Sequence, residues 1–587
     1  MPTRLIGLRS DRTTANVLVT RLNEPANNDT LTIGVVPLVD VGRSDPTTPE
    51  AVRTLPVQGW RRTPIRSKPT GPGDHLHWAK PVIEGLEPGT AYQLSVTDGE
   101  RPLGTATITT APADDERHLR LLAGSCFDVK GRHTRITDLA YNRLVEAADP
   151  MPTYNLWLGD QVYVDAPWRE TITTAKSRSI IFDRYLLTWG LRDRPDDDVE
   201  QEARRQPGVQ ASERVRNSLH GSMARTSNWF LPDDHEFWNG YPNPGWLTLF
   251  THALRRSAKQ VLRFAAKGKA HPAAQGEWGS AAGEAYALFA SPIDFGRFTE
   301  DVSPEQIQVF GTASAAVVLV DTRWHRTIRK KGRGASFMLG EQLDDLVRML
   351  REDERLICLA LSRPIVGHLP HRGVFRRKVE YGPEDFAEQY KALWRALADR
   401  RAAGRSTLVV AGDVHHHSVS TALEEGLLEV VSSPLSLLKA LDGESGLTRV
   451  RQGWKRVRGG LQASWRGIKR ILRRGEDAIR REAAAPPNAP TYPVFDDTGE
   501  WTAATGQSYY RAQDEEFVDV DEKGERVRVE PSGIMAIDIH SDEQGHTVTI
   551  GSVLGFVRHS GRPDIRREDW TFRWDNADGG IGAWRKQ

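Results

Sequence analysis

The sequence contains several short, continuous apolar runs that end abruptly in polar residues. A run of this length is typical of a strand that is buried on both faces. In open α/β sheets, functional sites lie beyond the carboxyl ends of the strands. Four of these ends carry residues able to bind a metal, namely Cys126, Asp160, Asp413 and the cluster Asp233-Asp234-His235-Glu236. One such end alone indicates only a strand followed by a polar turn, but the four together predict a single metal site.

The first part of the chain, residues 1–112, predicts a small all-β domain. Short segments of alternating polarity recur, and breaks rich in Pro and Gly separate them. The spacing from Leu86 to Tyr92, L-x-P-x-T-x-Y, resembles that of fibronectin type III domains, which share the immunoglobulin-like sandwich. In those domains the Tyr hydroxyl bonds back to the backbone at a corner of the sandwich. A β-hairpin with a Pro-Gly turn has the same spacing, but the flanking strands favour the sandwich.

From residue 117 the pattern alternates between strand and helix, which predicts a layered α/β domain over residues 117–587. Apolar runs predict strands at 119–124, 154–158, 228–232, 315–320, 356–361 and 408–411, and near the C-terminus at 534–539 and 547–550. Helical spacing covers 134–148 and 384–402, and residues 339–342 open a further helix.

Residues 447–479, within an insertion at about 440–490, have apolar positions at helical spacing and many Lys and Arg on the other face. One interpretation is a basic amphipathic helix that meets an anionic membrane, a partner or an acidic substrate. The other is a helical insertion that packs its apolar stripe on its own domain. The second is favoured, because such stripes usually face a core and because Gly459 and Gly460 weaken the helix midway.

Composition narrows the class of protein. The chain has 587 residues, more than one core usually holds, and a net charge of +1, so no electrostatic feature indicates a nucleic-acid partner. With only Cys126 and Cys358, no disulfide framework is expected, and Cys358 lies in an apolar run that predicts a buried side chain. No membrane-length apolar run, secretory signal or twin-Arg motif is present, so a cytoplasmic location is expected. The oligomeric state stays open.

The residue types at the four strand ends suit hydrolysis of a phosphoester by two metal ions that share one carboxylate. Asp160 is the natural bridge, and the phenolate of Tyr163, three residues on, suits a trivalent metal such as iron. Cys126 offers a thiolate if a metal lowers its pKa. Asp413 and His415 point the same way in an extended segment, and His417 shares that parity, so the imidazole ligand stays open among the three consecutive histidines.

The cluster at residues 233–236 supplies the remaining functions. One Asp can ligate the second metal, and His235 can contact the phosphate or protonate the leaving group. Glu236 is expected to orient His235. Taken alone, the cluster could equally be a charged turn at the surface.

At these residues the chain resembles the calcineurin-like metallophosphoesterase superfamily and, within it, the alkaline phosphatase D (PhoD-type) family. The motifs appear in the family's order as Gly124-Ser125-Cys126, Gly159-Asp160-x-x-Tyr163, Asp233-Asp234-His235-Glu236 and Gly412-Asp413-x-His415. The resemblance implies an α/β fold, a four-layer β-sandwich flanked by helices, with the small N-terminal β-domain ahead of it. The chain departs from the family pattern in two ways: it lacks a twin-Arg signal, and it contains the basic insertion.

The resemblance also implies an activity and a ligand set. Cys126, Asp160, Tyr163 and His415 would hold Fe³⁺, and Asp160, Asp234 and Asp413 would hold Ca²⁺, with other divalent metals as substitutes. His235 would be catalytic, and a metal-bound hydroxide would attack the phosphorus of a phosphomonoester or phosphodiester. Arg323 would contact the substrate phosphate or form a structural salt bridge.

The alternative is a non-catalytic protein that binds a membrane or a partner through the basic insertion at 447–479. A degenerate metal domain would usually have lost one of its ligands. Cys126, Asp160, Asp413 and His415 are all present, so the sequence favours the enzyme.

Overall fold

The fold is described from a computed structural model of the chain. The structure describes residues 3–22, 31–38, 53–129, 134–146, 153–164, 174–192, 219–237, 277–292, 307–327, 336–366, 386–413, 417–424, 426–435, 491–495, 501–505, 507–511, 517–520, 526–528, 531–543, 545–558, 563–575 and 582–587. The basic segment 447–479 and two of the three histidines, His415 and His416, lie outside these residues, and what the sequence predicts for them stays a prediction.

The described residues between 3 and 110, which we refer to as the N-terminal β-region, form two antiparallel sheets. The first has the order β1 (Thr3–Ser10), β2 (Thr14–Leu22), β6 (His75–Ala79), β5 (Arg61–Pro64), with β7 (Val82–Glu84) also paired to β2. The second has the order β4 (Arg53–Pro56), β3 (Leu31–Pro37), β8 (Ala91–Asp98), β9 (Arg101–Thr109). Alternate side chains of both sheets form one core, and the Tyr92 hydroxyl accepts a hydrogen bond from the Glu87 amide at 2.8 Å. The predicted all-β character and the predicted tyrosine contact are both present.

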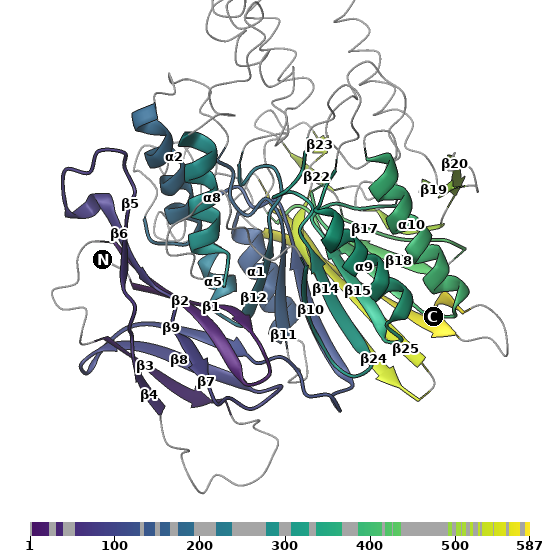
Figure 1. Cartoon of the computed structure of the whole chain (residues 1–587), viewed down its shortest axis with the longest axis horizontal. Coiled ribbons are helices and arrows are strands. Elements are labelled where there is room, and N and C mark those ends of the chain that lie inside the picture. Colours follow the sequence, from purple (N-terminus) through teal and green to yellow (C-terminus); the bar gives the residue numbers. More distant parts are fainter. Residues whose placement is uncertain are drawn as a thin grey trace, which may run out of the picture.

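The rest of the chain is built on two seven-stranded sheets (Figure 1). The first has the order β12 (Ser227–Leu231), β11 (Thr153–Leu158), β10 (His118–Gly124), β24 (Ser532–Asp542), β25 (Gly545–Val557), β26 (Pro563–Asp575), β27 (Ala583–Lys586). The second has the order β13 (Ile307–Gly311), β14 (Ala315–Val320), β15 (Leu356–Leu361), β16 (Thr407–Ala411), β18 (Leu427–Val431), β17 (Ser418–Ala422), β21 (Gln507–Arg511). Two short hairpins, β19 (Thr491–Phe495) with β20 (Trp501–Thr505) and β22 (Val518–Val520) with β23 (Arg526–Arg528), lie apart from them.

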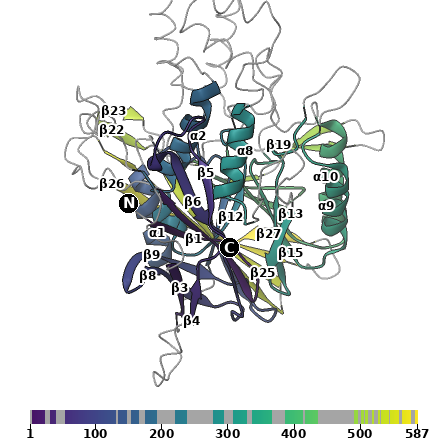
Figure 2. The ribbon, with the colours of Figure 1, turned by 60° about the vertical axis from the view of Figure 1, so that its left-hand side comes forward.

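The two sheets share a buried core, and helices pack against each of them. Apolar side chains of both sheets form a single buried cluster between them. Helices α9 (Gly340–Glu352) and α10 (Ala387–Ala402) pack on the other face of the second sheet, and α1 (Thr134–Glu146) packs on the first (Figure 2). Helices α2 (Thr174–Thr188), α5 (His220–Met223) and α8 (Glu277–Phe289) join the core around the first sheet. Because β10, β11, β14, β15 and β16 are covered on both sides, they read as continuous apolar runs.

The N-terminal β-region is closely joined to the first sheet. Residues of β1, β2 and β6 belong to the same buried cluster as α2 and α8. Strand β12 is the edge of the first sheet, and β1 packs beside it. The Ser227 hydroxyl of β12 donates to the Thr109 carbonyl at 2.8 Å and accepts from the Thr109 amide at 3.1 Å. This contact covers a strand edge that would otherwise expose unpaired backbone groups.

No helix within the described residues is long and apolar enough to cross a bilayer.

Candidate metal centre

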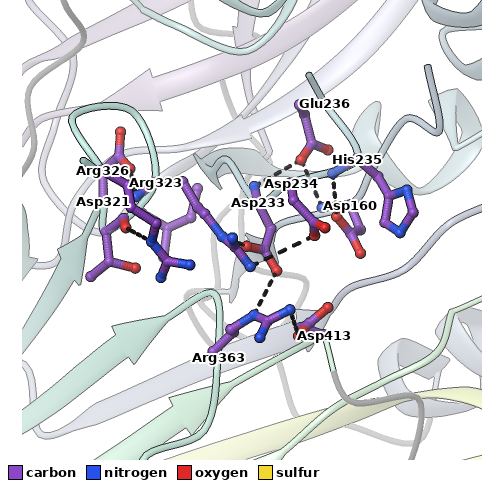
Figure 3. A network of polar contacts seen from close by, with 12 residues as sticks. Asp160, Asp233, Asp234, His235, Glu236, Asp321, Arg323, Arg326, Arg363 and Asp413 are labelled. Carbon is purple, nitrogen blue, oxygen red and sulfur yellow. Dashed lines mark hydrogen bonds and ion pairs between the residues drawn. The ribbon is translucent and has the colours of Figure 1, made fainter. Parts of the chain in front are cut away.

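The carboxyl ends of four buried strands meet at one place in the structure. Cys126 follows β10 and Asp160 follows β11, residues 233–236 follow β12, and Asp413 follows β16 of the second sheet. Cys126, Asp160, Asp233, Asp234, His235 and Asp413 form what we refer to as the strand-end cluster. The site therefore lies at the same end of both sheets. Figure 3 shows its polar network, which includes Asp160, Asp233, Asp234, His235 and Asp413.

Three members of the strand-end cluster have a backbone conformation that is unusual for their residue type. The φ angles of Cys126, Asp160 and Asp413 are 60°, 57° and 65°. A non-glycine residue in this left-handed region costs about 1–2 kcal/mol relative to an ordinary conformation. Such residues persist where the surrounding structure holds them, and they are concentrated at functional sites. Here the left-handed turn comes at the point where each strand ends and its side chain enters the site.

The glycine before each aspartate allows the strands to approach closely. A Cβ on Gly412 would lie 2.6 Å from the Ser125 side chain and 2.7 Å from the Leu158 carbonyl oxygen. A Cβ on Gly159 would lie 2.5 Å from the Cβ of Asp233. The Gly-Asp pairs in the sequence are therefore explained by packing: glycine lets backbones from different strands meet, and the aspartate that follows points into the gap.

One half of the site combines sulfur and oxygen donors. The Tyr163 hydroxyl donates to Oδ2 of Asp160 at 3.2 Å, and Sγ of Cys126 lies 3.6 Å from the same oxygen. One ligand atom each of Cys126, Asp160 and Asp413 lies within 4.8 Å of the others. The structure thus brings together three predicted iron ligands, Cys126, Asp160 and Tyr163, with Asp413 beside them. The fourth, His415, is outside the described residues.

The other half of the site is formed by oxygen donors. Asp160, Asp233, Asp234 and Asp413 each place one carboxylate oxygen within 4.8 Å of the others. A second group of the same compactness contains Asp160, Asp234 and His235. Asp160 belongs to every group, which agrees with the bridging position that the sequence predicts for it. Hard oxygen ligands of this kind suit calcium or magnesium.

Glu236 holds the loops of the site together through their backbone. Its carboxylate accepts hydrogen bonds from the amides of Asp160 at 2.9 Å, Asp233 at 2.8 Å and Val162 at 3.2 Å. The sequence suggested that Glu236 orients the His235 ring, but these bonds go to the ends of β11 and β12. Glu236 therefore positions the two strand ends relative to each other.

His235 is held at the centre of the cluster. Its amide donates to Oδ1 of Asp160 at 3.1 Å, and its ring packs on Tyr163 with the ring centroids 4.1 Å apart. The side chain is almost fully buried. This placement leaves the imidazole beside the carboxylates, as a proton donor in the site requires.

Two buried arginines neutralise part of the acidic charge. Arg323 forms ion pairs with Asp233 and, at 3.7 Å, with Asp234, and its side chain is 1% exposed. Arg363 contacts Asp413 at 2.6 Å and Asp233 at 3.5 Å (Figure 3). For Arg323, the geometry favours the salt bridge over the phosphate contact, and the phosphate contact stays a prediction.

Arg363 is the residue of the site that sequence reasoning missed. It lies two positions beyond the apolar run 356–361, but an arginine is not a metal ligand, so the pattern that identified the other strand ends does not include it.

The electrostatics of the cluster favour a bound cation. Burial raises the pKa of Asp160 to about 7, and the neighbouring charges of Asp234 and Asp233 add to the effect, while His235 opposes it. Burial also raises the pKa values of Cys126 and Tyr163, with Asp160 as the next cause for both. The pKa of Asp413 is likewise raised by burial, despite the opposing charge of Arg363. A metal ion would reverse these shifts by stabilising the deprotonated donors. The donor set therefore fits one softer and one harder metal position.

Comparisons with known proteins identify the fold. The architecture and the strand-end cluster define a two-sheet α/β protein with a group of side chains able to hold a metal ion at the ends of its strands. A solved structure described as "Structure of PhoD" is similar to this chain, with a TM-score of 0.53 and 14% sequence identity, and the match covers 99% of this chain and 91% of that chain. The chain therefore has a PhoD-like fold. No family model matches the sequence, and no curated protein does.

Proposed function

We propose that the protein is a metal-dependent phosphoric ester hydrolase that cleaves phosphomonoesters or phosphodiesters. The observation that carries this proposal is the convergence of Cys126, Asp160, Asp234 and Asp413 within one site. The PhoD-like fold supports it, because the motifs that resemble alkaline phosphatase D lie at the strand ends of that fold. We also propose that the catalytic part of the chain has the four-layer arrangement and that the N-terminal region is fibronectin-like. A cytoplasmic location is part of the same proposal.

The site has donors for two kinds of metal. Cys126, Asp160 and Tyr163, with His415, would hold iron, and Asp160, Asp234 and Asp413 would hold calcium or another divalent ion. Bound metal ions would supply positive charge for the phosphoryl oxygens and lower the pKa of a water molecule. Asp233 is held by both arginines, so we assign it to the positioning of those side chains.

The chain's own groups provide the remaining chemistry. His235 lies beside Asp160 and Asp234 and would give a proton to the leaving oxygen of the ester. Asp160 accepts from the His235 amide, and Glu236 binds the Asp160 amide, so one network fixes both residues. Burial of Asp160, Asp234 and His235 strengthens the electrostatic interactions between them.

Metal analysis and hydrolysis assays on the full-length protein test the proposal. We expect iron near one atom per chain and hydrolysis of a chromogenic phosphoester that increases when calcium is added. Asp160→Asn should abolish both metal retention and turnover. Asp345→Asn, which removes an exposed carboxylate on α9, is the matched control and should change neither. A protein that stays inactive towards both monoesters and diesters after iron and calcium are supplied would contradict the proposal.

A further inference from the structure

The turn that follows β15 brings a cation to the edge of the site. Arg363 lies in this turn, with Nη2 2.6 Å from Oδ2 of Asp413 and Nε 3.5 Å from Oδ2 of Asp233. Its side chain is 10% exposed and that of Asp413 is 12% exposed, whereas Arg323 is 1% exposed. Arg363 is therefore the cation of the site that lies nearer to solvent, and it borders the predicted metal ligands.

The same turn is held from below by a buried carboxylate. Glu429 lies in β18, is 1% exposed, and accepts hydrogen bonds from the Ile365 amide at 2.7 Å and the Val366 amide at 3.0 Å. Burial raises its pKa to about 8, although the two amide bonds oppose this. The Tyr390 hydroxyl of α10 donates to the Ile365 carbonyl at 3.3 Å. Burying a carboxylate within a sheet is unfavourable unless hydrogen bonds compensate for its lost hydration. For Glu429 those hydrogen bonds come from the backbone of the turn that carries Arg363, so they hold that turn in place.

We propose that Arg363 binds the phosphoryl group of the substrate and that Glu429 is the positioning residue that holds Arg363 in place. This inference rests on the proposed function and names how the substrate is recognised. A guanidinium offers five N–H donors in a planar fork that matches phosphate oxygens. Arg323 is enclosed between Asp233 and Asp234, so its donors are directed into the protein. Arg363 has the more open position and the weaker contact with Asp233.

Calorimetric titration of the metal-loaded, full-length protein with inorganic phosphate tests the role of Arg363 directly. Arg363→Gln should weaken phosphate binding about 10- to 100-fold, because a charge-assisted hydrogen bond to the ligand is lost. Arg363→Lys keeps the charge but lacks the planar fork of donors. Its phosphate affinity should therefore lie between those of the wild type and Arg363→Gln. Metal content should be unchanged in both variants. In the hydrolysis assay, KM should rise more than kcat falls.

A double-mutant cycle tests whether Glu429 acts through Arg363. Glu429→Leu removes both acceptor oxygens and should weaken phosphate binding, whereas Glu429→Gln keeps an acceptor and should lie closer to the wild type. In the Arg363→Gln background, Glu429→Leu should change phosphate affinity by less than about twofold, since coupled residues are not additive. Glu424→Gln alters an exposed glutamate in the turn between β17 and β18 and is the matched control.

Several results would overturn the inference. Phosphate affinity within about twofold of the wild type in Arg363→Gln would make Arg363 only a counter-ion for Asp413. Additive effects in the cycle would remove Glu429 from the mechanism, and a metal-loaded wild type that does not bind phosphate would contradict both roles. Phosphate binding that depends on Arg363, in a protein that hydrolyses no ester, would instead contradict the proposed function and leave this inference standing.

Discussion

Two regions of the first sheet bury polar groups in different ways. At the joint with the N-terminal β-region, Asn228 is 1% exposed and all its partners are neutral. Its amide nitrogen lies 2.6 Å from the Gly7 carbonyl oxygen and 2.8 Å from that of Met223. Its side-chain oxygen accepts from Asn155 at 3.0 Å and from Trp157 at 2.7 Å. We refer to these contacts as the Asn228 network.

The opposite end of the same strands buries charges. There Asp160, Asp233 and Asp234, together with Asp413 from the end of β16 in the second sheet, share a small volume with two arginines. Asp160 and Asp413 have left-handed backbones. A fully hydrogen-bonded neutral network stabilises a fold. Buried carboxylates with raised pKa values and strained backbone, here Asp160 and Asp413, destabilise it unless a ligand is bound. The comparison separates the structural end of these strands from the functional end.

The largest expected effect comes from the charged end. Asp160→Asn should lower hydrolysis at least about 100-fold, because loss of even an outer partner of a metal ligand costs 10- to 100-fold. The metal-free variant should nevertheless be more stable than the metal-free wild type. Steady-state assays and denaturant unfolding of the same samples measure both.

The sign of that stability gain follows from the pKa of Asp160, which is raised from 3.8 to about 7. An acid with a raised pKa in the folded state loses stability as pH rises between the two values. The stability difference between Asp160→Asn and the wild type should therefore grow from pH 4 to pH 7. A stability difference that shrinks over this range would contradict the conclusion that the buried Asp160 carboxylate destabilises the metal-free protein.

The next effect comes from the neutral end. Asn228→Ala should lower the free energy of unfolding by about 3 kcal/mol, because buried groups of Asn155, Trp157 and Gly7 lose their partner. Activity per folded molecule should change little. Asn142→Ala, which removes one exposed contact with Arg225, is the matched control. If Asn228→Ala alters kcat while stability is unchanged, the two ends are not separate.

A smaller loss of stability is expected from a substitution at Gly412, where backbones of different strands approach each other closely. Gly412→Ala places a Cβ against Ser125 and the Leu158 carbonyl, and overpacking of this kind typically costs about 1–3 kcal/mol. The adjacent Asp413 would shift with it, so metal affinity should fall as well. Gly340→Ala is the control, because Gly340 has no positive φ and its Cβ would meet nothing within 4 Å. Equal metal affinity in the two variants would argue against close packing as the reason for Gly412.

The smallest expected effect is a pH-dependent change in stability at the contact between the N-terminal β-region and the first sheet. Burial, with a smaller contribution from the nearby Arg4, lowers the pKa of His220 from 6.5 to about 4. A base with a depressed pKa in the folded state loses stability as pH falls below its unfolded value. Between pH 6.5 and 5.5 the wild type should lose about 1 kcal/mol that His220→Gln does not lose. Denaturation midpoints at the two pH values measure the difference, and parallel losses in both proteins would exclude His220 as the cause.

Much of the local structure was predictable from the sequence, because strands covered on both faces leave unbroken apolar runs. The runs 315–320 and 356–361 coincide with β14 and β15. Helix α10 begins three residues later than predicted and ends at the predicted residue. The strand-end rule also predicts that Cys126, Asp160 and Asp413 meet, and their ligand atoms lie within 4.8 Å of one another.

Long-range relations were not predictable in this way. The pattern around β10 contains no information that its second neighbour is β24, far along the chain. The roles of Glu236 and Glu429 depend on which backbone amides point towards them, and those amides come from other strands. An arginine after a strand, such as Arg363, is usually a surface residue, so its burial against Asp413 becomes visible only in three dimensions.

The position of β10 has a consequence for the order of events on the ribosome. Strand β10 lies between β11 and β24, and the paired side chains Arg120 and Asp538 are separated by 418 residues. At typical synthesis rates this interval lasts roughly 20–80 s, during which β10 has no partner on one side. The described strands of the N-terminal β-region lie within the first 109 residues and can form their own core early, but the face that they share with α2 and α8 is covered only later. The nascent chain thus carries an early β-region and an open sheet together, and a ribosome that stops before residue 532 releases a chain with an unprotected strand at its centre.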